Sequence, residues 1–303
     1  MKIKILLLVV LFYILPAQAQ EKQIITSDHV KLYVNVKGQG TPCLYIHGGP
    51  GSGSYWMEKF FGDFLEQHFR MIYLDQRGVG RSSTPEDHNY SMERMLKDFE
   101  EVRKALGIEN WLTLGHSFGG ILQAEYARNF PQSTKGLIMI NCTLDMRESF
   151  CTSWIPKACE FLGIEDTVEC SENPAQLLNG FMGVAGPLNE QGLAWKMAFA
   201  LQENENRMDA TYEEIPGWNN DFSSVALTIG DYWKNFKTIT PEIDQPVLFF
   251  YGYKDWSVGP EHYKSINFPN MILYGSDVGH IPFMENRADL GKAITTYMKK
   301  YLL

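Results

Sequence analysis

Short apolar runs recur along the first half of the chain and again near its C-terminus, each bounded by polar, Gly or Pro residues. Runs of this length with many β-branched and aromatic residues predict buried strands. The strands that we expect cover residues 30–36, 44–47, 71–74, 111–114, 137–140, 247–251 and 271–274.

Helical periodicity separates several of these strands. In residues 91–106 apolar side chains recur at helical spacing, with Ser91 placed to cap the helix and Gly107 placed to end it. Further helices are expected over residues 121–129 and 288–302. Strands that alternate with helices predict an α/β fold, with a mostly parallel sheet covered by helices on both faces.

The strand pattern is absent between residues 144 and 237, where the sequence becomes helical and rich in Trp, Met and acidic residues. Pro and Gly interrupt it at Pro174, at Gly186-Pro187 and at Pro216-Gly217. We interpret residues 144–237 as a helical cap inserted into one α/β core, which comprises residues 20–143 and 238–303.

The first 19 residues have the pattern of a signal peptide. Lys2 and Lys4 form a basic start, residues 5–15 are apolar, and Ala17-Gln18-Ala19 fits a cleavage site. We expect cleavage after Ala19, export to the periplasm or medium, and no stable membrane anchor afterwards. The alternative, a retained anchor, is disfavoured because the apolar run is short for a bilayer span.

Composition narrows the range of partners. The formal net charge is −9 and no dense Lys/Arg cluster occurs, so a phosphate backbone would be repelled and nucleic acid is not an expected partner.

Cys43 and Cys142 lie in apolar runs and are expected to be buried thiols. One pair among Cys151, Cys159 and Cys170 could form a disulfide in an oxidising compartment, and the sequence does not say which.

The segment Gly115-His116-Ser117-Phe118-Gly119 follows a predicted strand and precedes a predicted helix. A serine at such a sharp turn adopts strained backbone geometry, which small neighbours permit, and its hydroxyl then stands above the sheet. We therefore predict that Ser117 is a nucleophile.

A base and an acid should follow the nucleophile in the order serine, acid, histidine. Asp255 and His280 both lie just beyond predicted strand ends, where open α/β sheets bind ligands. Asp244 precedes its strand, and Asp277 is too close to His280 in sequence to reach the far ring nitrogen. His116 is a rival base, but its side chain is expected to point away from Ser117, and His47 belongs to another loop.

Attack on a carbonyl also requires donors for the oxyanion. The backbone N–H of Phe118, directly after the nucleophile, is the first candidate. The second is the N–H of Gly49, in the glycine-rich loop at residues 47–53. This loop lacks the Lys-Ser/Thr pair of a phosphate-binding loop, which argues against that alternative.

Three segments occur together in order: His47-Gly48-Gly49-Pro50-Gly51, the Asp75 to Ser82 segment D-Q-R-G-V-G-R-S, and Gly115 to Gly120. With them the chain resembles the proline iminopeptidase-like family of α/β-hydrolases. The resemblance implies the α/β-hydrolase fold and an aminopeptidase that releases an N-terminal residue, often proline, from short peptides. It also implies that Glu203, in Ala200-Leu201-Gln202-Glu203-Asn204, binds the substrate's free amine; a solvated surface glutamate is the alternative.

These observations lead to one predicted chemistry and several predicted substrates. We expect a serine hydrolase that forms an acyl-enzyme on a small peptide or small acyl substrate and needs neither metal nor organic cofactor. The elbow residues His116 and Phe118 are common in esterases of this fold, so an esterase is the nearest alternative, and a non-enzymatic binding protein is the other.

We expect Asp75 and Arg77 to hold their loop by local hydrogen bonds and to have no catalytic role. The oligomeric state is not predicted.

Overall fold

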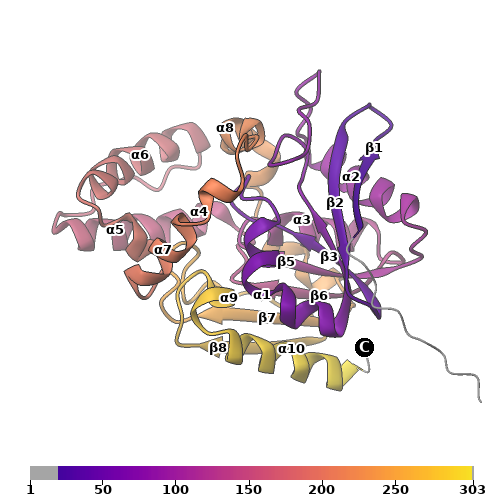
Figure 1. Ribbon diagram of the computed structural model, residues 1–303. Helices are drawn as coiled ribbons and strands as arrows, with labels where there is room; N and C mark the ends of the chain where they lie inside the picture. Colours follow the sequence, from indigo (N-terminus) through magenta and orange to yellow (C-terminus); the bar gives the residue numbers. More distant parts are fainter. Residues whose placement is uncertain (1–19, 302–303) are drawn as a thin grey trace, which may run out of the picture.

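The computed structural model describes residues 20–301 (Figure 1). The predicted signal peptide at residues 1–19 lies outside this range. Among the described residues, no helix is both long and apolar enough to cross a membrane.

An eight-stranded sheet forms the centre of the molecule, in the order β1-β2-β4-β3-β5-β6-β7-β8. Strand β2 pairs antiparallel with both β1 and β4, and the strands from β4 to β8 along the sheet pair in parallel. The strands are β1 (Gln20–Ile25), β2 (Lys31–Lys37), β3 (Thr41–Ile46), β4 (Phe69–Leu74), β5 (Trp111–His116), β6 (Thr134–Ile140), β7 (Val247–Gly252) and β8 (Met271–Ser276).

Helices cover both faces of this sheet. Helices α1 (Tyr55–His68), α9 (Pro282–Glu285) and α10 (Arg287–Tyr301) pack on one face, and α2 (Met92–Ala105) and α3 (Gly119–Asn129) pack on the other. Strand β3 shows why: Cys43 and Tyr45 belong to the apolar cluster under α1 and α10, and Leu44 and Ile46 belong to the cluster under α2 and α3. Alternate side chains of a strand point to opposite faces, so both faces of this apolar strand must be covered.

Helices and short helical turns make up the chain between β6 and β7, a stretch that lies wholly within the described residues and contains no strand of the sheet. In Figure 1, α5, α6 and α7 extend to the left of the sheet. The elements are α4 (Met146–Ser149), the π-helical turn η1 (Phe150–Trp154), α5 (Ile155–Leu162), α6 (Pro174–Glu190), η2 (Ala194–Met197), α7 (Gln202–Asp209), η3 (Tyr212–Glu214), α8 (Asp221–Val225), η4 (Ala226–Thr228), η5 (Gly230–Trp233) and η6 (Phe236–Glu242).

Part of this helical segment has its own core. Side chains of α5 and α6, including Ile155, Leu177 and Leu188, form an apolar cluster separate from those of the sheet. A disulfide joins Cys151 to Cys170, which identifies the pair that the sequence left open. Cys43, Cys142 and Cys159 are free and buried.

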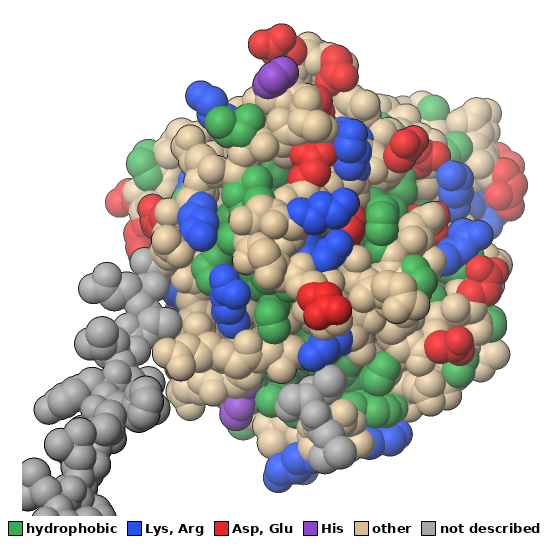
Figure 2. All heavy atoms as spheres, turned by 90° about the vertical axis from the view of Figure 1, so that its right-hand side faces the viewer, with side chains coloured by type: hydrophobic (Ala, Val, Ile, Leu, Met, Phe, Trp, Pro, Cys, Tyr) green, Lys and Arg blue, Asp and Glu red, His purple; other side chains and the backbone are tan. Residues whose placement is uncertain are grey.

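Charged side chains of both signs are interspersed over the face shown in Figure 2, with no large area of a single sign. Exposed charges also pair across elements elsewhere on the surface, as Lys59 does with Glu214 and Arg287 with Asp63. Exposed pairs of this kind contribute little to stability.

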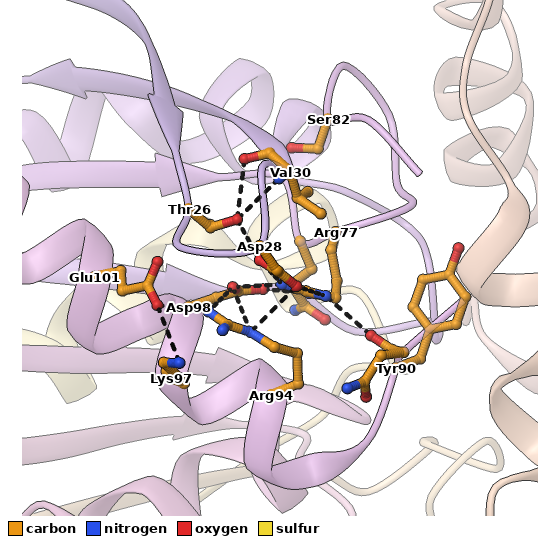
Figure 3. Close-up of polar contacts among 12 residues, drawn as sticks. Thr26, Asp28, Val30, Arg77, Ser82, Tyr90, Arg94, Lys97, Asp98 and Glu101 are labelled. Atoms are coloured by element: carbon orange, nitrogen blue, oxygen red, sulfur yellow. Dashed lines mark hydrogen bonds and ion pairs between the residues drawn. The ribbon is translucent and has the colours of Figure 1, made fainter. Parts of the chain in front are cut away.

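Local hydrogen bonds hold the loop after β4, as predicted for Asp75, which accepts from Ser82 and Arg81. The Arg77 side chain, for which local bonds were also expected, instead belongs to a buried ion-pair network with distant partners (Figure 3). The Arg77 guanidinium donates to both oxygens of Asp98, with its Nε 2.6 Å from Oδ2, and also donates to Asp28. Arg94 shares Asp98, at 2.7 Å. Arg77 is fully buried, so the network ties this loop to the β1–β2 turn and to α2.

Removing Asp98 should therefore destabilise the fold. We expect Asp98→Ala to lower the free energy of unfolding by about 3 kcal/mol, because the buried Arg77 charge would keep only Asp28 as its carboxylate partner. Urea unfolding followed by circular dichroism measures this change. Glu261→Ala removes an exposed pair with Lys264 and should leave the unfolding midpoint unchanged; equal effects of the two substitutions would contradict the interpretation.

Candidate active site

Ser117 lies at the sharp turn between β5 and α3. Its φ is +54°, in the left-handed region that few non-glycine residues adopt. Its N–H donates to the carbonyl of Ile140, at 3.2 Å, which fixes the turn against β6. A Cβ on Gly119 would come within 2.2 Å of the Ile46 carbonyl oxygen. Only glycine fits there, so the second glycine of the motif is a steric requirement of the turn.

Asp255 and His280 meet at the same edge of the sheet. Asp255 follows β7, His280 follows β8, and His280 Nδ1 lies 3.0 Å from each Asp255 carboxylate oxygen. The backbone N–H of Val258 also donates to Asp255, at 3.1 Å. Both side chains are buried. A carboxylate on Nδ1 orients the imidazole and leaves Nε2 to act as a base.

Ser117 and His280 line one cavity of about 360 Å³. The structure therefore brings together the three residues that the sequence selected, although Ser117 and His280 are 163 positions apart in the chain. No hydrogen bond joins the Ser117 hydroxyl to His280 within the described chain. Such bonds are often long without substrate and tighten in the substrate complex.

The two predicted oxyanion donors line the same cavity. Gly49 has a φ of +109°, which a residue with a side chain would adopt only under strain, and Phe118 caps the start of α3. Neither backbone N–H donates to another group of residues 20–301. Two free N–H groups beside a nucleophile can stabilise a developing negative charge on a carbonyl oxygen.

His47 holds the glycine-rich loop in place. Its Nε2 accepts the Gln76 N–H at 3.1 Å, and the Gln76 side chain donates to the His47 carbonyl at 3.1 Å. Burial lowers the pKa of His47 to about 4, so the ring is neutral near pH 7 and can accept this bond. The loop after β4 thus supports the loop that carries Gly49.

Asp75 supports the other end of the glycine-rich loop. Its carboxylate accepts from the N–H and hydroxyl of Ser54, both at 2.8 Å, and pairs with Arg81 at 2.7 Å. Burial opposes ionisation of Asp75, but the Arg81 guanidinium holds the pKa of this carboxyl below its usual value. These contacts hold the end of the glycine-rich loop against the loop after β4.

His116, which was expected to point away from Ser117, contacts the loop of His280. It lines the cavity, its Nε2 lies 2.9 Å from the His280 carbonyl oxygen, and the two rings are 4.7 Å apart. Burial and the nearby His280 lower the pKa of His116 to about 3, so its neutral ring can donate Nε2–H to that carbonyl. The sequence signalled only its adjacency to Ser117, because the contact depends on how β5 and the loop after β8 pack.

Glu203 is not brought to this cavity. It lies in the first turn of α7, is exposed, and is not among the residues that line the cavity. The buried carboxylate that the family resemblance implied is therefore not found at this position, because the buried residue of that turn is Asn204.

Apolar and neutral side chains make up the rest of the cavity wall. Of the residues that the structure describes, no Asp, Glu, Lys or Arg lines it. The remaining lining residues are Pro50, Ser52, Thr143, Met146, Ser149, Phe150, Trp154, Phe181, Leu227, Ser257, Val258 and Ile281. Within residues 20–301 no group of three or more His, Cys, Asp or Glu side chains is placed to hold a metal ion.

The low pKa values of His47 and His116 predict that the folded protein loses stability in acid. Their folded-state pKa values lie below the ordinary 6.5, so the unfolded chain binds more protons as pH falls from 6.5 toward 4. Stability is then complete above pH 6.5 and is lost on acidification. For His116 alone this loss should be about 3 kcal/mol between pH 6.5 and 4.

Denaturant unfolding of His116→Gln at both pH values checks this expectation. The variant should lose less stability on acidification than the unsubstituted protein by that amount. His88 is exposed, and His88→Gln is the matched control, which should retain the full pH dependence. A wild-type pH dependence in His116→Gln would show that His116 is not held neutral by the fold.

The chain matches the family model described as alpha/beta hydrolase fold over residues 41–155. It is 28% identical to a 1-acylglycerol-3-phosphate O-acyltransferase from Arabidopsis thaliana, over 87% of this chain and 68% of the relative. It is 35% identical to a proline iminopeptidase from Neisseria gonorrhoeae over 125 residues, which cover 39% of this chain and 37% of the relative. The match therefore spans little more than a third of the iminopeptidase.

The fold also matches the crystal structure of a proline iminopeptidase-related protein from Thermus thermophilus. The TM-score is 0.78 at 19% identity, and the match covers 93% of this chain and 98% of the other. The predicted fold class, an α/β-hydrolase fold, is confirmed, as is the resemblance to proline iminopeptidases. The match to the family model described as alpha/beta hydrolase fold supports a hydrolase.

Proposed function

We propose that this protein, which has the α/β-hydrolase fold, is a serine hydrolase that cleaves esters or related derivatives of small, uncharged, apolar acyl groups. Ser117 Oγ attacks the acyl carbonyl while His280 Nε2 takes its proton, and Asp255 stabilises the resulting imidazolium. The N–H groups of Phe118 and Gly49 receive the oxyanion. His280 then protonates the leaving group, and water attacks the acyl-enzyme with His280 again as base.

The observation that carries this substrate class is the lack of any carboxylate among the described residues of the cavity wall. A peptide with a free N-terminus would bring an ammonium group into a cavity whose wall carries no carboxylate. Without a paired carboxylate, desolvation of that charge costs several kcal/mol. An uncharged acyl group has no such cost, so the cavity favours it.

The shape of the cavity supports a small acyl group. Three aromatic rings form one wall. The ring centroids of Phe150 and Phe181 are 4.7 Å apart in a stacked arrangement, and those of Trp154 and Phe181 are 4.4 Å apart. The volume of about 360 Å³ is near the lower end for small-molecule sites. The relative from Arabidopsis thaliana is named as an O-acyltransferase, and acyl transfer is related chemistry with a different acceptor.

An aminopeptidase is the second candidate, favoured by 35% identity to a proline iminopeptidase over 125 residues. For this function Glu203, or another carboxylate, would have to reach the cavity when substrate binds. The neutral wall of the cavity argues against it, and the two candidates differ sharply in what they predict for a substrate whose amine is blocked.

Ser117→Ala should lower kcat by roughly a thousandfold or more, because the nucleophile is lost while substrate contacts remain. Labelling by a fluorophosphonate probe should disappear at the same time. Ser224 is exposed and its hydroxyl donates to the Asp221 carbonyl, so Ser224→Ala is the control and should retain activity and labelling. If folded Ser117→Ala kept full turnover, the catalytic assignment would be wrong, and absence of labelling in the unsubstituted protein would favour a binding protein.

A substrate panel separates ester hydrolysis from aminopeptidase activity. We expect kcat/KM to be highest for aryl esters of short acyl groups such as butyrate, and we expect N-acetyl-proline arylamide to be cleaved at least as well as proline arylamide. Comparing the two arylamides keeps the leaving group constant and tests the amine alone. Cleavage of proline arylamide that is abolished by acetylation, and weakened by Glu203→Gln, would establish the aminopeptidase instead.

A further inference from the structure

Glu285 lies at the end of α9, close to His280, and its carboxylate bridges two separate stretches of backbone. Oε1 accepts the Ala200 N–H at 2.6 Å, and Oε2 accepts the Gly279 N–H at 2.5 Å. Gly279 directly precedes His280, whereas Ala200 belongs to the helical segment between β6 and β7. No Lys or Arg of the described chain pairs with Glu285, so these backbone groups are its partners.

The His280 backbone is held by contacts on every side. Its N–H donates to the Ala198 carbonyl at 2.6 Å, and its carbonyl accepts from His116 at 2.9 Å. The Gly279 carbonyl accepts from the Asn141 side chain at 2.8 Å. The segment from Ala198 to Ala200 therefore runs along the loop of the general base and contacts it twice, once directly and once through Glu285.

The same segment also contacts the loop of the triad acid. The Ser257 hydroxyl donates to the Met197 carbonyl at 3.0 Å, and Ser257 lies two residues beyond Asp255. Residues 197–200 thus join the loops that carry Asp255 and His280, and Ser257 itself lines the cavity.

The approach at Gly279 is too close for any side chain. A Cβ there would lie 2.5 Å from the Ala198 carbonyl oxygen and 3.0 Å from Glu285 Oε2. The tight packing fixes the distance between Glu285 and the backbone of the base. Hydrogen bonds to a carboxylate are roughly twice as strong as bonds between neutral groups.

A carboxylate is an unfavourable group at this place for stability alone. Burial raises the pKa of Glu285, and the negative charge of Asp255 acts in the same direction, while the two backbone donors and His280 oppose them. The geometry that it imposes on the loop of the base offers a reason for its presence.

We propose that Glu285 is a positioning residue for His280. Its carboxylate holds residues 198–200 of the helical segment against the loop of the base, so that His280 keeps a fixed position relative to the cavity wall. The inference rests on the proposed role of His280 as general base. Small displacements of a catalytic group have large kinetic effects, since a shift of about 1 Å can cost about 100-fold in rate.

Glu285→Gln tests the proposal with little change in shape, because the amide can accept only one of the two backbone N–H groups. We expect kcat on the best ester to fall by about 10- to 100-fold with KM changed by less than about threefold. The downfield NMR resonance of the His280 Nδ1 proton should shift or broaden, which a remote structural role would not cause. Asp277→Asn is the matched control: Asp277 is exposed on the same loop and pairs with Lys254, so both readouts should stay unchanged.

Glu285→Asp keeps the charge and shortens the reach, and it decides the question if the Gln variant does not fold. A folded Asp variant should show the same fall in kcat with a wild-type circular dichroism spectrum. Wild-type kcat and an unchanged His280 resonance in either folded variant would overturn the proposal, as would failure of both variants to fold, which would assign Glu285 to stability alone. Lack of any turnover or probe labelling in the unsubstituted protein would instead reject the proposed function, and the NMR comparison would still decide the role of Glu285.

Discussion

The left-handed backbone at Ser117 is the constraint on which the rest of the site depends. This turn places the serine above the sheet only because two other chain segments approach it closely. Gly119 packs against the end of β3, and a Cβ on Gly48 would lie 2.6 Å from the Ser117 Cβ. The loop after β3 must therefore carry glycine at this approach, and its residue Gly49 lines the same cavity as Ser117. The placement of the proposed nucleophile and of the proposed donor Gly49 thus depends on the same close packing.

Support for this arrangement extends outward in layers. His47 and Asp75 hold the two ends of the glycine-rich loop. The loop that contains Asp75 is in turn fixed by the buried pairing of Arg77 with Asp98 and Asp28. A charged network on one side of the sheet thus contributes to the geometry of an uncharged cavity at its edge. Preorganisation of this kind avoids reorganising donors during the reaction.

The sequence predicted those features that depend on local pattern and chain order. Ser117, Asp255 and His280 could be found because each follows an apolar strand, and parallel strands bring their ends to one edge. Strand β1 was not predicted, because its residues are mostly polar and exposed and show no clear alternation. Neither the role of His116 nor the exposure of Glu203 could be read from spacing, since both depend on how separate elements pack. The same holds for Glu285, whose partners lie in a distant segment, and for the choice of Cys170 as the partner of Cys151.

The Cys151–Cys170 bond has a consequence for how the chain is produced. Cys151 belongs to η1, which supplies Phe150 and Trp154 to the cavity wall, and Cys170 lies on the loop that leads into α6, which supplies Phe181. The covalent link therefore joins the two elements whose aromatic rings meet at the wall proposed to hold the acyl group. Protein made in a reducing cytosol would lack this covalent link between η1 and the loop before α6. For the proposed hydrolase, acyl-chain selectivity would then depend on the redox history of the sample, whereas the placement of Ser117, Asp255 and His280 at the sheet edge would not.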